Sequence, residues 1–316
     1  MDNRYWPVYQ RLEQEFLNFA HMIHIDDEQL SVYSTSIADL LIKVVVQIEA
    51  LSKELFVREG GDKKQYSRFY FDKPCLEKLN EKWNLGDKVV LISCPFLYLE
   101  DPSKKCFTPL DQSWEKGADA SAWKQAYQAV KHDRGNSLKE GNFENVLHAL
   151  GACFLLNLYY YDLELSLGKD DKARGFNEHL GSSIFSVKIH PFSGYINPGY
   201  TEDDAVDECV YLIRITDESK ARIQYGLQRL NSTLQSPGLA SALPPRINLT
   251  QDQFNRIDDF RQKIKELDTP SSPYVATPGE YMAISTDWIK DMLQGILDGI
   301  EYEVVTNKGQ YKKHPM

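Results

Sequence analysis

Four ionisable residues stand side by side in the stretch YQAVKHDRGN, residues 127–136: Lys131, His132, Asp133 and Arg134. A histidine beside an arginine can cleave RNA without a metal ion. The imidazole takes the proton of a ribose 2′-hydroxyl, and the guanidinium stabilises the extra negative charge on the phosphate in the transition state. Histidine suits this role because its free pKa lies near neutrality. The stretch is therefore a candidate ribonuclease site.

The same four residues also fit the end of a helix. Cations such as Lys131, His132 and Arg134 interact favourably with the helix dipole in a last turn, and Gly135 is well placed as the stop. Residues two apart do not share a helix face. His132 and Arg134 therefore converge only if the helix ends between them or a second subunit contributes. The sequence is compatible with both interpretations.

The cluster closes a predicted helix with the sequence ASAWKQAYQAVKHDR. Trp123, Tyr127, Val130 and Arg134 lie along one face of this helix, which predicts that this face packs against the rest of the fold. Another helix follows and runs to about residue 166 through the apolar stretch VLHALGACFLLNLYYY. We interpret that stretch as a buried core helix, because it is too short to span a bilayer.

An earlier helix, predicted over residues 31–57, has apolar residues at alternating spacings of four and three. This pattern is typical of a helix that packs against antiparallel neighbours in a bundle. The residues of this seam are Ile37, Leu41, Val44, Ile48, Leu51 and Leu55. We expect the seam to pack against the apolar helix around residues 146–161 in the core.

Glu49 interrupts the apolar surface of this long helix. It can form an i, i+4 ion pair with Lys53, in the orientation that favours helices. Alternatively, it faces the bundle interior and orients His132 or Arg134, because a buried carboxylate needs a partner and the cluster supplies cations. We therefore take His132 and Arg134 as the candidate catalytic pair, with Lys131 and Glu49 in support.

Three stretches together resemble HEPN-like domains: QIEALSKEL, AWKQAYQAVKHDR and NFENVLHALGACFLL. The resemblance is to uncharacterised bacterial relatives with a Trp, a Tyr and a KHxR-type element before a hydrophobic final helix, and it covers about residues 1–166. It implies an antiparallel helical bundle, often dimeric. Many such domains are metal-independent ribonucleases of toxin–antitoxin and phage-defence systems, and others bind only nucleotides or partner proteins.

The ribonuclease members of that family use an Arg-x(4–6)-His motif. The required positions before His132 hold glutamine, alanine and tyrosine, and His148 also lacks the arginine. One formal match, Arg174 with His179, lies in a charged connector beyond the apolar helix. Two functions stay open. The chain is an RNA-directed or nucleotide-directed protein of a bacterial defence or stress system, or it is a non-catalytic interaction module.

The predicted fold class is mainly α, with the bundle over 1–166 and a second part over 167–316. A strand at 88–93 and a long loop form an insertion in the bundle at about 84–118. The alternating stretches IFSVKIH and CVYLIRI predict two strands, which we expect to pair as a β-hairpin. Three further helices are predicted over 218–234, 251–267 and 287–300.

His21 and His24, which precede Asp26 and Asp27, offer a second possible site. Two histidines three apart share a helix face, as metal ligands do, but two acids after a helix also cap the next one. We assign no metal site here. The chain contains no P-loop, G-x-G-x-x-G or G-x-S-x-G motif in a suitable context, so we predict no cofactor.

The net charge of −10 argues against a protein that coats a nucleic acid duplex, because neutralising phosphates requires Lys and Arg. RNA or nucleotide contact would therefore be local. The cysteine count is five, without a C-x-x-C motif, which favours reduced thiols. The start of the chain is polar and no apolar run is long enough for a membrane. We expect a cytoplasmic protein with an RNA, nucleotide or protein partner, able to form a homodimer.

Overall fold

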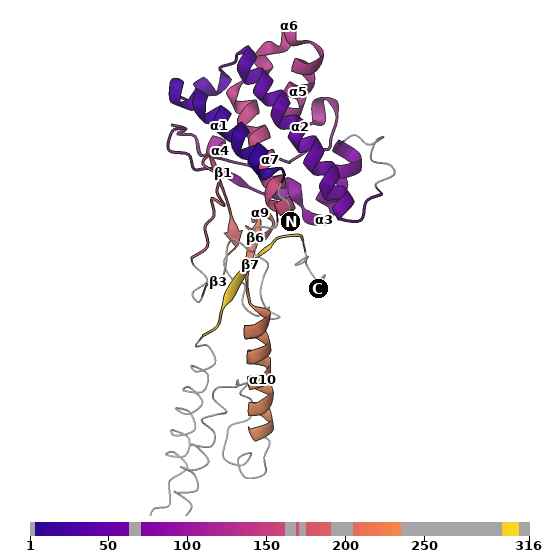
Figure 1. Cartoon of the computed structure of the whole chain (residues 1–316), viewed down its shortest axis with the longest axis vertical. Helices are drawn as coiled ribbons and strands as arrows, with labels where there is room; N and C mark the ends of the chain where they lie inside the picture. Colours follow the sequence, from indigo (N-terminus) through magenta and orange to yellow (C-terminus); the bar gives the residue numbers. More distant parts are fainter. Residues whose placement is uncertain are drawn as a thin grey trace, which may run out of the picture. The chain divides into compact units, whose positions relative to one another are not determined.

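The structure is a computed structural model of the 316-residue chain (Figure 1). The residues that it describes are 4–62, 71–161, 169–170, 175–190, 205–234 and 299–309. The helix predicted over 251–267 lies outside these residues, and so does nearly all of the helix predicted over 287–300. The described part is mainly helical, as predicted, and contains small sheets.

The chain divides into two compact units. The first comprises Met1–Gly168, Gly175–Ile213 and Val304–Met316, and the second comprises Lys169–Arg174 and Arg214–Glu303. We expected a boundary near residue 166, whereas the described residues 175–190 and 205–213 belong to the first unit. The candidate site residues all belong to this first unit.

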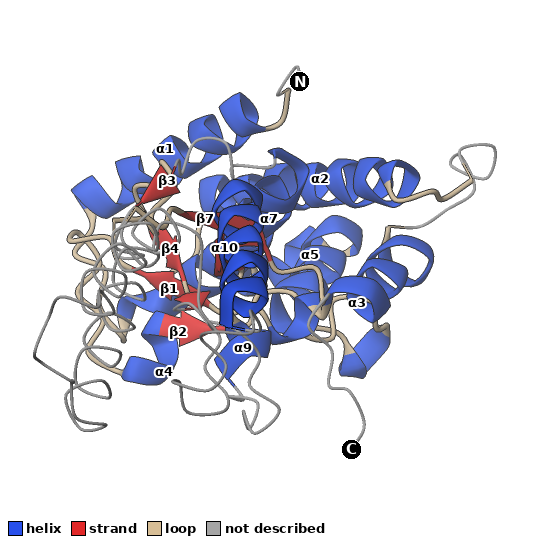
Figure 2. Ribbon diagram, turned by 90° about the horizontal axis from the view of Figure 1, so that it is seen from below, coloured by secondary structure: helices blue, strands red, loops and turns tan. Residues whose placement is uncertain are grey.

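The four longest helices described in the first unit are α1 (Trp6–Met22), α2 (Thr35–Arg58), α5 (Ala122–His132) and α7 (Phe143–Tyr161). They lie side by side in Figures 1 and 2, and α1, α2 and α5 each pack against α7. The contact between α2 and α7 is the most extensive among the described elements, so the predicted packing of these two helices is confirmed. Helix α7 takes the central place because it is apolar nearly all round.

The seam of α2 is buried along its whole length, since each of its six residues is exposed by 2% or less. The side-chain oxygen of Ser34 accepts the N–H of Ile37 at 3.2 Å and caps the start of the helix. The apolar surface does not extend all round, because Val46 remains 47% exposed. The four-and-three spacing of the seam therefore predicted correctly which face of α2 is buried.

Helix α7 begins after Asn142, whose side-chain oxygen accepts the N–H of Asn145 at 3.0 Å. Asn142 therefore caps the start of α7. No helix within the described ranges combines the length and apolar character that crossing a membrane would require.

Short helical segments fill the connections of the first unit. The stretch KPCLEKLNEKW forms a π-helical turn followed by α3, and Asn84 ends α3 in the left-handed conformation with φ of 52°. The short segments are η1 (Gln29–Ser31), η3 (Asp72–Glu77), α3 (Lys78–Trp83), η4 (Leu85–Asp87), α4 (Pro102–Lys105), η5 (Gly117–Asp119), α6 (Arg134–Ser137), η6 (Leu138–Glu140) and α9 (Ala205–Glu208).

The strand predicted at 88–93 forms as β1 (Val90–Ile92). It lies between β2 (Cys106–Phe107) and β4 (Phe185–Val187) and pairs with both in antiparallel register (Figure 2). Val90 stands opposite Phe107 on one side and Val187 on the other. The insertion thus joins the segment that follows the bundle in the sequence.

The predicted β-hairpin is wrong. The stretch IFSVKIH divides into β4, which pairs with β1, and β5 (Ile189–His190). Strand β5 pairs in parallel with β6 (Tyr211–Ile215), with Ile189 opposite Tyr211. Parallel strands need a crossover and cannot be joined as a hairpin. Alternation of apolar residues predicted the strands themselves, but it carries no information about their partners or directions.

The second unit contains β3 (Lys169–Asp170), the predicted helix α10 (Asp217–Leu234) and part of β7 (Tyr302–Thr306). Strand β3 pairs with β7 in antiparallel register. The side chains of Ile223 and Ile300 are buried together at its core. This unit has a small apolar core of its own.

Candidate functional site

The KHDR cluster (Lys131, His132, Asp133 and Arg134) lies at the junction of α5 and α6. Helix α5 ends at His132, and the N–H of Asp133 still bonds to a carbonyl of the last turn. The carboxyl of Asp133 then accepts the N–H of Asn136 at 3.4 Å and caps α6. The predicted stop at Gly135 is wrong, because the side chain of Asp133 competes for backbone donors and ends the helix earlier.

The side chains of the KHDR cluster separate from one another. Arg134 pairs with Asp39 of α2, and both side chains are more than 40% exposed. The Lys131 ammonium lies over the Tyr127 ring at 5.1 Å from its centroid. His132 is exposed and makes no polar or ring contact with any residue that the structure describes. The helix does end between His132 and Arg134, yet the guanidinium serves a surface ion pair.

Glu49 forms the ion pair with Lys53. The Lys53 ammonium lies 2.5 Å from the Glu49 carboxyl, whose side chain is 38% exposed. This is the i, i+4 arrangement within one helix, and it satisfies the carboxyl group without the cations of the KHDR cluster. Glu49 thus lies apart from His132 and Arg134.

The other histidines considered in the sequence have structural neighbours. The His148 ring stacks on Phe107 with centroids 4.3 Å apart, and burial lowers its pKa. His179 shares a hydrogen bond of 3.2 Å with the Ser93 hydroxyl. Arg174, its partner in the formal Arg-x-His match, lies outside the described residues.

The five cysteines are all free thiols. Burial raises the pKa of Cys94, and it raises the pKa of Cys153 to about 12. Thiols with raised pKa values hold little thiolate at neutral pH and are therefore poor nucleophiles.

His21 and His24 face aromatic rings. His21 meets Phe96 edge-on with ring centroids 4.9 Å apart, and His24 stacks on Tyr98 at 4.1 Å. Across the ranges that the structure describes, no group of three or more metal-ligating side chains could hold a metal ion. The carboxyl of Asp26 instead accepts the N–H of Glu28 at 2.8 Å, directly before η1. These residues form a surface of rings, which we call the ring surface: His21, His24, Phe96 and Tyr98.

In the ring surface, His21 lies at the end of α1 and Phe96 lies in a turn. His24 and Tyr98 lie beside residues 25 and 97, where two segments of the chain are bonded to each other. Ile25 and Leu97 form a parallel bridge, and the Tyr98 N–H donates to the Ile25 carbonyl at 2.8 Å. Ile25, Leu97 and Leu99 are buried, whereas Phe96 and Tyr98 are 45% and 49% exposed. Over residues 97–100 buried and exposed side chains alternate, as they do in an extended strand. The segment belongs to the predicted long loop, and the alternation in Phe-Leu-Tyr-Leu-Glu is the signal that could have predicted this pattern.

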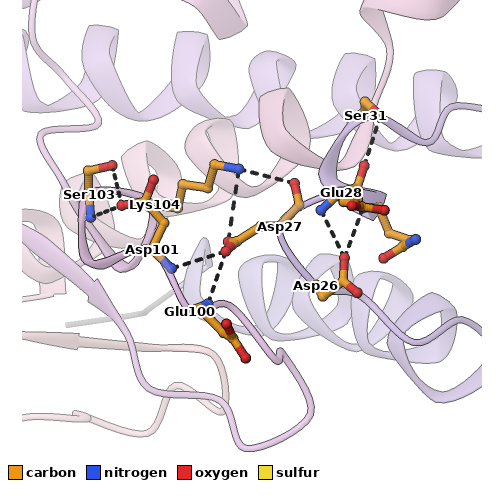
Figure 3. Close-up of polar contacts among 9 residues, drawn as sticks. Asp26, Asp27, Glu28, Ser31, Glu100, Asp101, Ser103 and Lys104 are labelled. Carbon is orange, nitrogen blue, oxygen red and sulfur yellow. Dashed lines mark hydrogen bonds and ion pairs between the residues drawn. The ribbon is translucent and has the colours of Figure 1, made fainter.

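Asp27 holds the two segments together beyond the rings (Figure 3). Its carboxyl accepts the N–H groups of Glu100 at 3.2 Å and Asp101 at 3.0 Å. The Lys104 ammonium donates to the Asp27 carbonyl at 3.1 Å. The Glu100 side chain points away from Asp27 in Figure 3 and is exposed. The backbone beneath the rings is thus fixed, while a carboxyl group at its end stays available.

Glu13 is a buried carboxyl group that the sequence analysis missed. It is 3% exposed and accepts hydrogen bonds from the Tyr9 hydroxyl at 2.7 Å and from the Ser182 hydroxyl. The N–H groups of Ser183 and Ile184 also point to it, at 3.2 and 3.3 Å. Burial and, second, the charge of Glu13 raise the pKa of Tyr9 well above its usual value. This cluster ties α1 to the start of β4 and is closed to solvent.

Lys88 is a second buried ion that the sequence analysis missed. Its ammonium donates to the Asp207 carbonyl at 2.7 Å, and its side chain is fully buried. Burial lowers the pKa of Lys88 to about 8, although Asp207 and Asp87 oppose the shift. A lysine with a lowered pKa can act as a nucleophile, but this one is enclosed and serves the packing of α9.

Comparison with known proteins returned no relative from which a role could be transferred. No protein-family model matches the chain, and no curated protein or solved structure matches it. A function can therefore be inferred only from the geometry of the described residues.

Proposed function

We propose that this chain is a HEPN-like, non-catalytic interaction module that binds a partner protein through the ring surface. The observation that carries this proposal is the exposure of Phe96 and Tyr98, at 45% and 49%. Their segment is held in place by the backbone hydrogen bonds of Tyr98 and Glu100 to residues 25 and 27. Exposed aromatic side chains on a rigid support are typical of the centres of protein interfaces. Because these side chains are already held in place before a partner binds, less conformational entropy is lost on association.

The geometry of the KHDR cluster supports the non-catalytic alternative. A catalytic arginine must hold a phosphate, but the guanidinium of Arg134 pairs with Asp39. His132 stands exposed at the end of α5, with no described residue to orient its ring. The absence of an arginine separated from His132 by four to six residues also favours a non-catalytic role.

A ribonuclease assay tests the absence of catalysis. The purified chain is incubated with a broad panel of single-stranded RNAs in EDTA, and the products are examined for 2′,3′-cyclic phosphate ends. We expect no cleavage by the parent or by His132→Ala. Metal-independent cleavage that disappears in a folded His132→Ala variant would restore the catalytic hypothesis and refute the proposal.

Photo-cross-linking tests the binding role. Phe96 is replaced by p-benzoylphenylalanine and the chain is irradiated in cells of its source organism. Tyr225, a 53% exposed tyrosine of α10 in the second unit, is replaced in the same way as a control. We expect protein adducts at position 96 that are absent from position 225. Absence of a specific protein adduct at position 96 would count against an interaction module that uses this surface.

A further inference from the structure

The ring surface continues into carboxyl groups. Phe96 lies in a turn, which the hydrogen bond from the Leu97 N–H to the Cys94 carbonyl closes, and the chain continues from there to Glu100. Because successive side chains of an extended chain point to opposite sides, Tyr98 and Glu100 project from the same side, about 7 Å apart. The exposed fractions agree, since Leu99 between them is buried. The row therefore presents two aromatic rings and then an acid.

The charges around this row are predominantly negative. Segments 21–28 and 96–105 contain five acidic side chains and two lysines. Lys104 is engaged by Asp27, while Lys105 is an exposed cation that offsets part of the negative charge. Glu28 and Glu100 are exposed, and neither side chain has a cationic partner among the described residues. The whole chain carries −10, so long-range forces attract a basic partner and repel phosphates.

We infer that the ring surface binds an extended, arginine-rich segment of a partner protein; this inference rests on the proposed function. A guanidinium stacks on an aromatic face and also pairs with a carboxylate, so it matches both groups in the row. Arginines at every second residue of an extended peptide project to one side with a spacing of about 7 Å, which matches that of Tyr98 and Glu100. One arginine would stack on each ring, and the next would pair with Glu100.

The rigidity of the support favours this mode of binding. His24 covers one face of the Tyr98 ring and His21 contacts the edge of Phe96, so the ring positions are set before a ligand arrives. The two hydrogen bonds from Tyr98 and Glu100 to residues 25 and 27 fix the backbone as well. A preorganised surface loses less entropy when it binds a flexible peptide.

Fluorescence anisotropy with labelled peptides tests the inference. The probes are a 12-residue peptide that alternates Arg and Gly, its Glu-Gly counterpart and a 12-nucleotide single-stranded RNA. We expect the full chain to bind the Arg-Gly peptide and neither of the others. Tyr98→Ala should weaken binding by about tenfold, as loss of a cation–π contact does, and Tyr98→Phe should retain it. Glu100→Gln should weaken binding by about threefold at low salt, because it removes an exposed ion pair.

Two matched variants serve as controls. Tyr225→Ala removes an exposed ring, and Glu54→Gln removes an exposed carboxylate on α2. Both should bind the Arg-Gly peptide like the parent. Equal losses in these variants and in those of the ring surface would overturn the inference, because the binding would then follow net charge only. If Tyr98→Ala fails to fold, the Glu100→Gln comparison decides.

The outcomes also separate this inference from the proposed function. Protein adducts at position 96 without binding of the Arg-Gly peptide would refute the cationic partner and leave the interaction module in place. If the RNA probe binds and Tyr98→Ala abolishes that binding, the partner of the ring surface is a nucleic acid and the inference of a protein partner is wrong. Absence of adducts at position 96 would reject the module itself, whatever the peptide does.

Discussion

The KHDR cluster and the Glu13 cluster lie in the same unit but in opposite environments. His132 and Arg134 stand at a helix end in solvent, and Arg134 uses an exposed ion pair. Glu13 is enclosed and has hydroxyl and backbone donors on its carboxyl oxygens. Exposed pairs contribute little to stability, whereas a buried polar group is costly as soon as its partners are removed.

A run of ionisable residues in the sequence is therefore a poor guide to which charged groups contribute most to stability. The run KHDR drew attention because its residues are adjacent in the sequence. Glu13 is a single acid in an ordinary helix, but it lies on the stripe of α1 that Tyr9, Leu12 and Phe16 bury. Its position in the helical period was the signal that could have predicted its burial.

The largest expected effect belongs to Glu13. Glu13→Ala should lower the free energy of unfolding by about 3 kcal/mol, because it removes the carboxyl group that accepts from two buried hydroxyls and leaves the Ile184 N–H only its bond to Ser182. Glu15→Ala, on the same helix but paired with Lys43 at the surface, should cost less than about 1 kcal/mol. Chemical denaturation measures both variants. Equal losses of stability in the two variants would contradict the claim that the buried carboxyl group contributes more than the exposed one.

The second effect is a pH dependence from Lys88. Its pKa is about 8 in the folded protein and 10.5 in its ordinary state. Between these values the unfolded chain binds more protons, so the contribution of Lys88 to the free energy of unfolding rises with pH. The parent and Lys88→Met are denatured at several pH values. Between pH 8 and 10.5, the free energy of unfolding of the parent should rise by about 3 kcal/mol relative to that of the variant. Parallel curves for the two proteins would contradict this account of Lys88.

The KHDR cluster should show a small effect. Arg134→Ala and Asp39→Ala should each change the free energy of unfolding by about 1 kcal/mol or less, and the coupling between them should be about 0.2–1 kcal/mol. His132→Ala should stay within about 1 kcal/mol, the size of a helix-dipole interaction. A double-mutant cycle by denaturation gives these values. Coupling of several kcal/mol would show that the pair is not a simple surface contact.

Glu49 should show the smallest effect. Glu49→Gln removes an ion pair within α2 and should cost about 0.3–0.5 kcal/mol, reduced further at high salt. Thermal denaturation at two salt concentrations detects the change. A cost above about 2 kcal/mol that persists at high salt would place Glu49 in a role beyond its pair with Lys53.

The helices of the first unit were largely predictable. The seam from Ile37 to Leu55 reported a buried face because a helical period fixes which residues share a side. The end of α5 was not predictable to the residue, because the choice between Gly135 and Asp133 depended on a cap that forms only in the folded turn. The partners of β4, β5 and β6 were also beyond the sequence, since alternation specifies faces and leaves the pairing open.

The places where helices and strands form, and the faces of them that are apolar, depend on residues close together in the chain and can be predicted from the sequence. The partners that the buried charges bond to, and the side chains that meet, depend on the tertiary structure. Glu13 needed Ser182, Lys88 needed Asp207, and the rings of His24 and Tyr98 needed the bridge between Ile25 and Leu97. These partners lie far apart in the sequence, and their contacts form through the packing of the whole unit rather than through any local pattern.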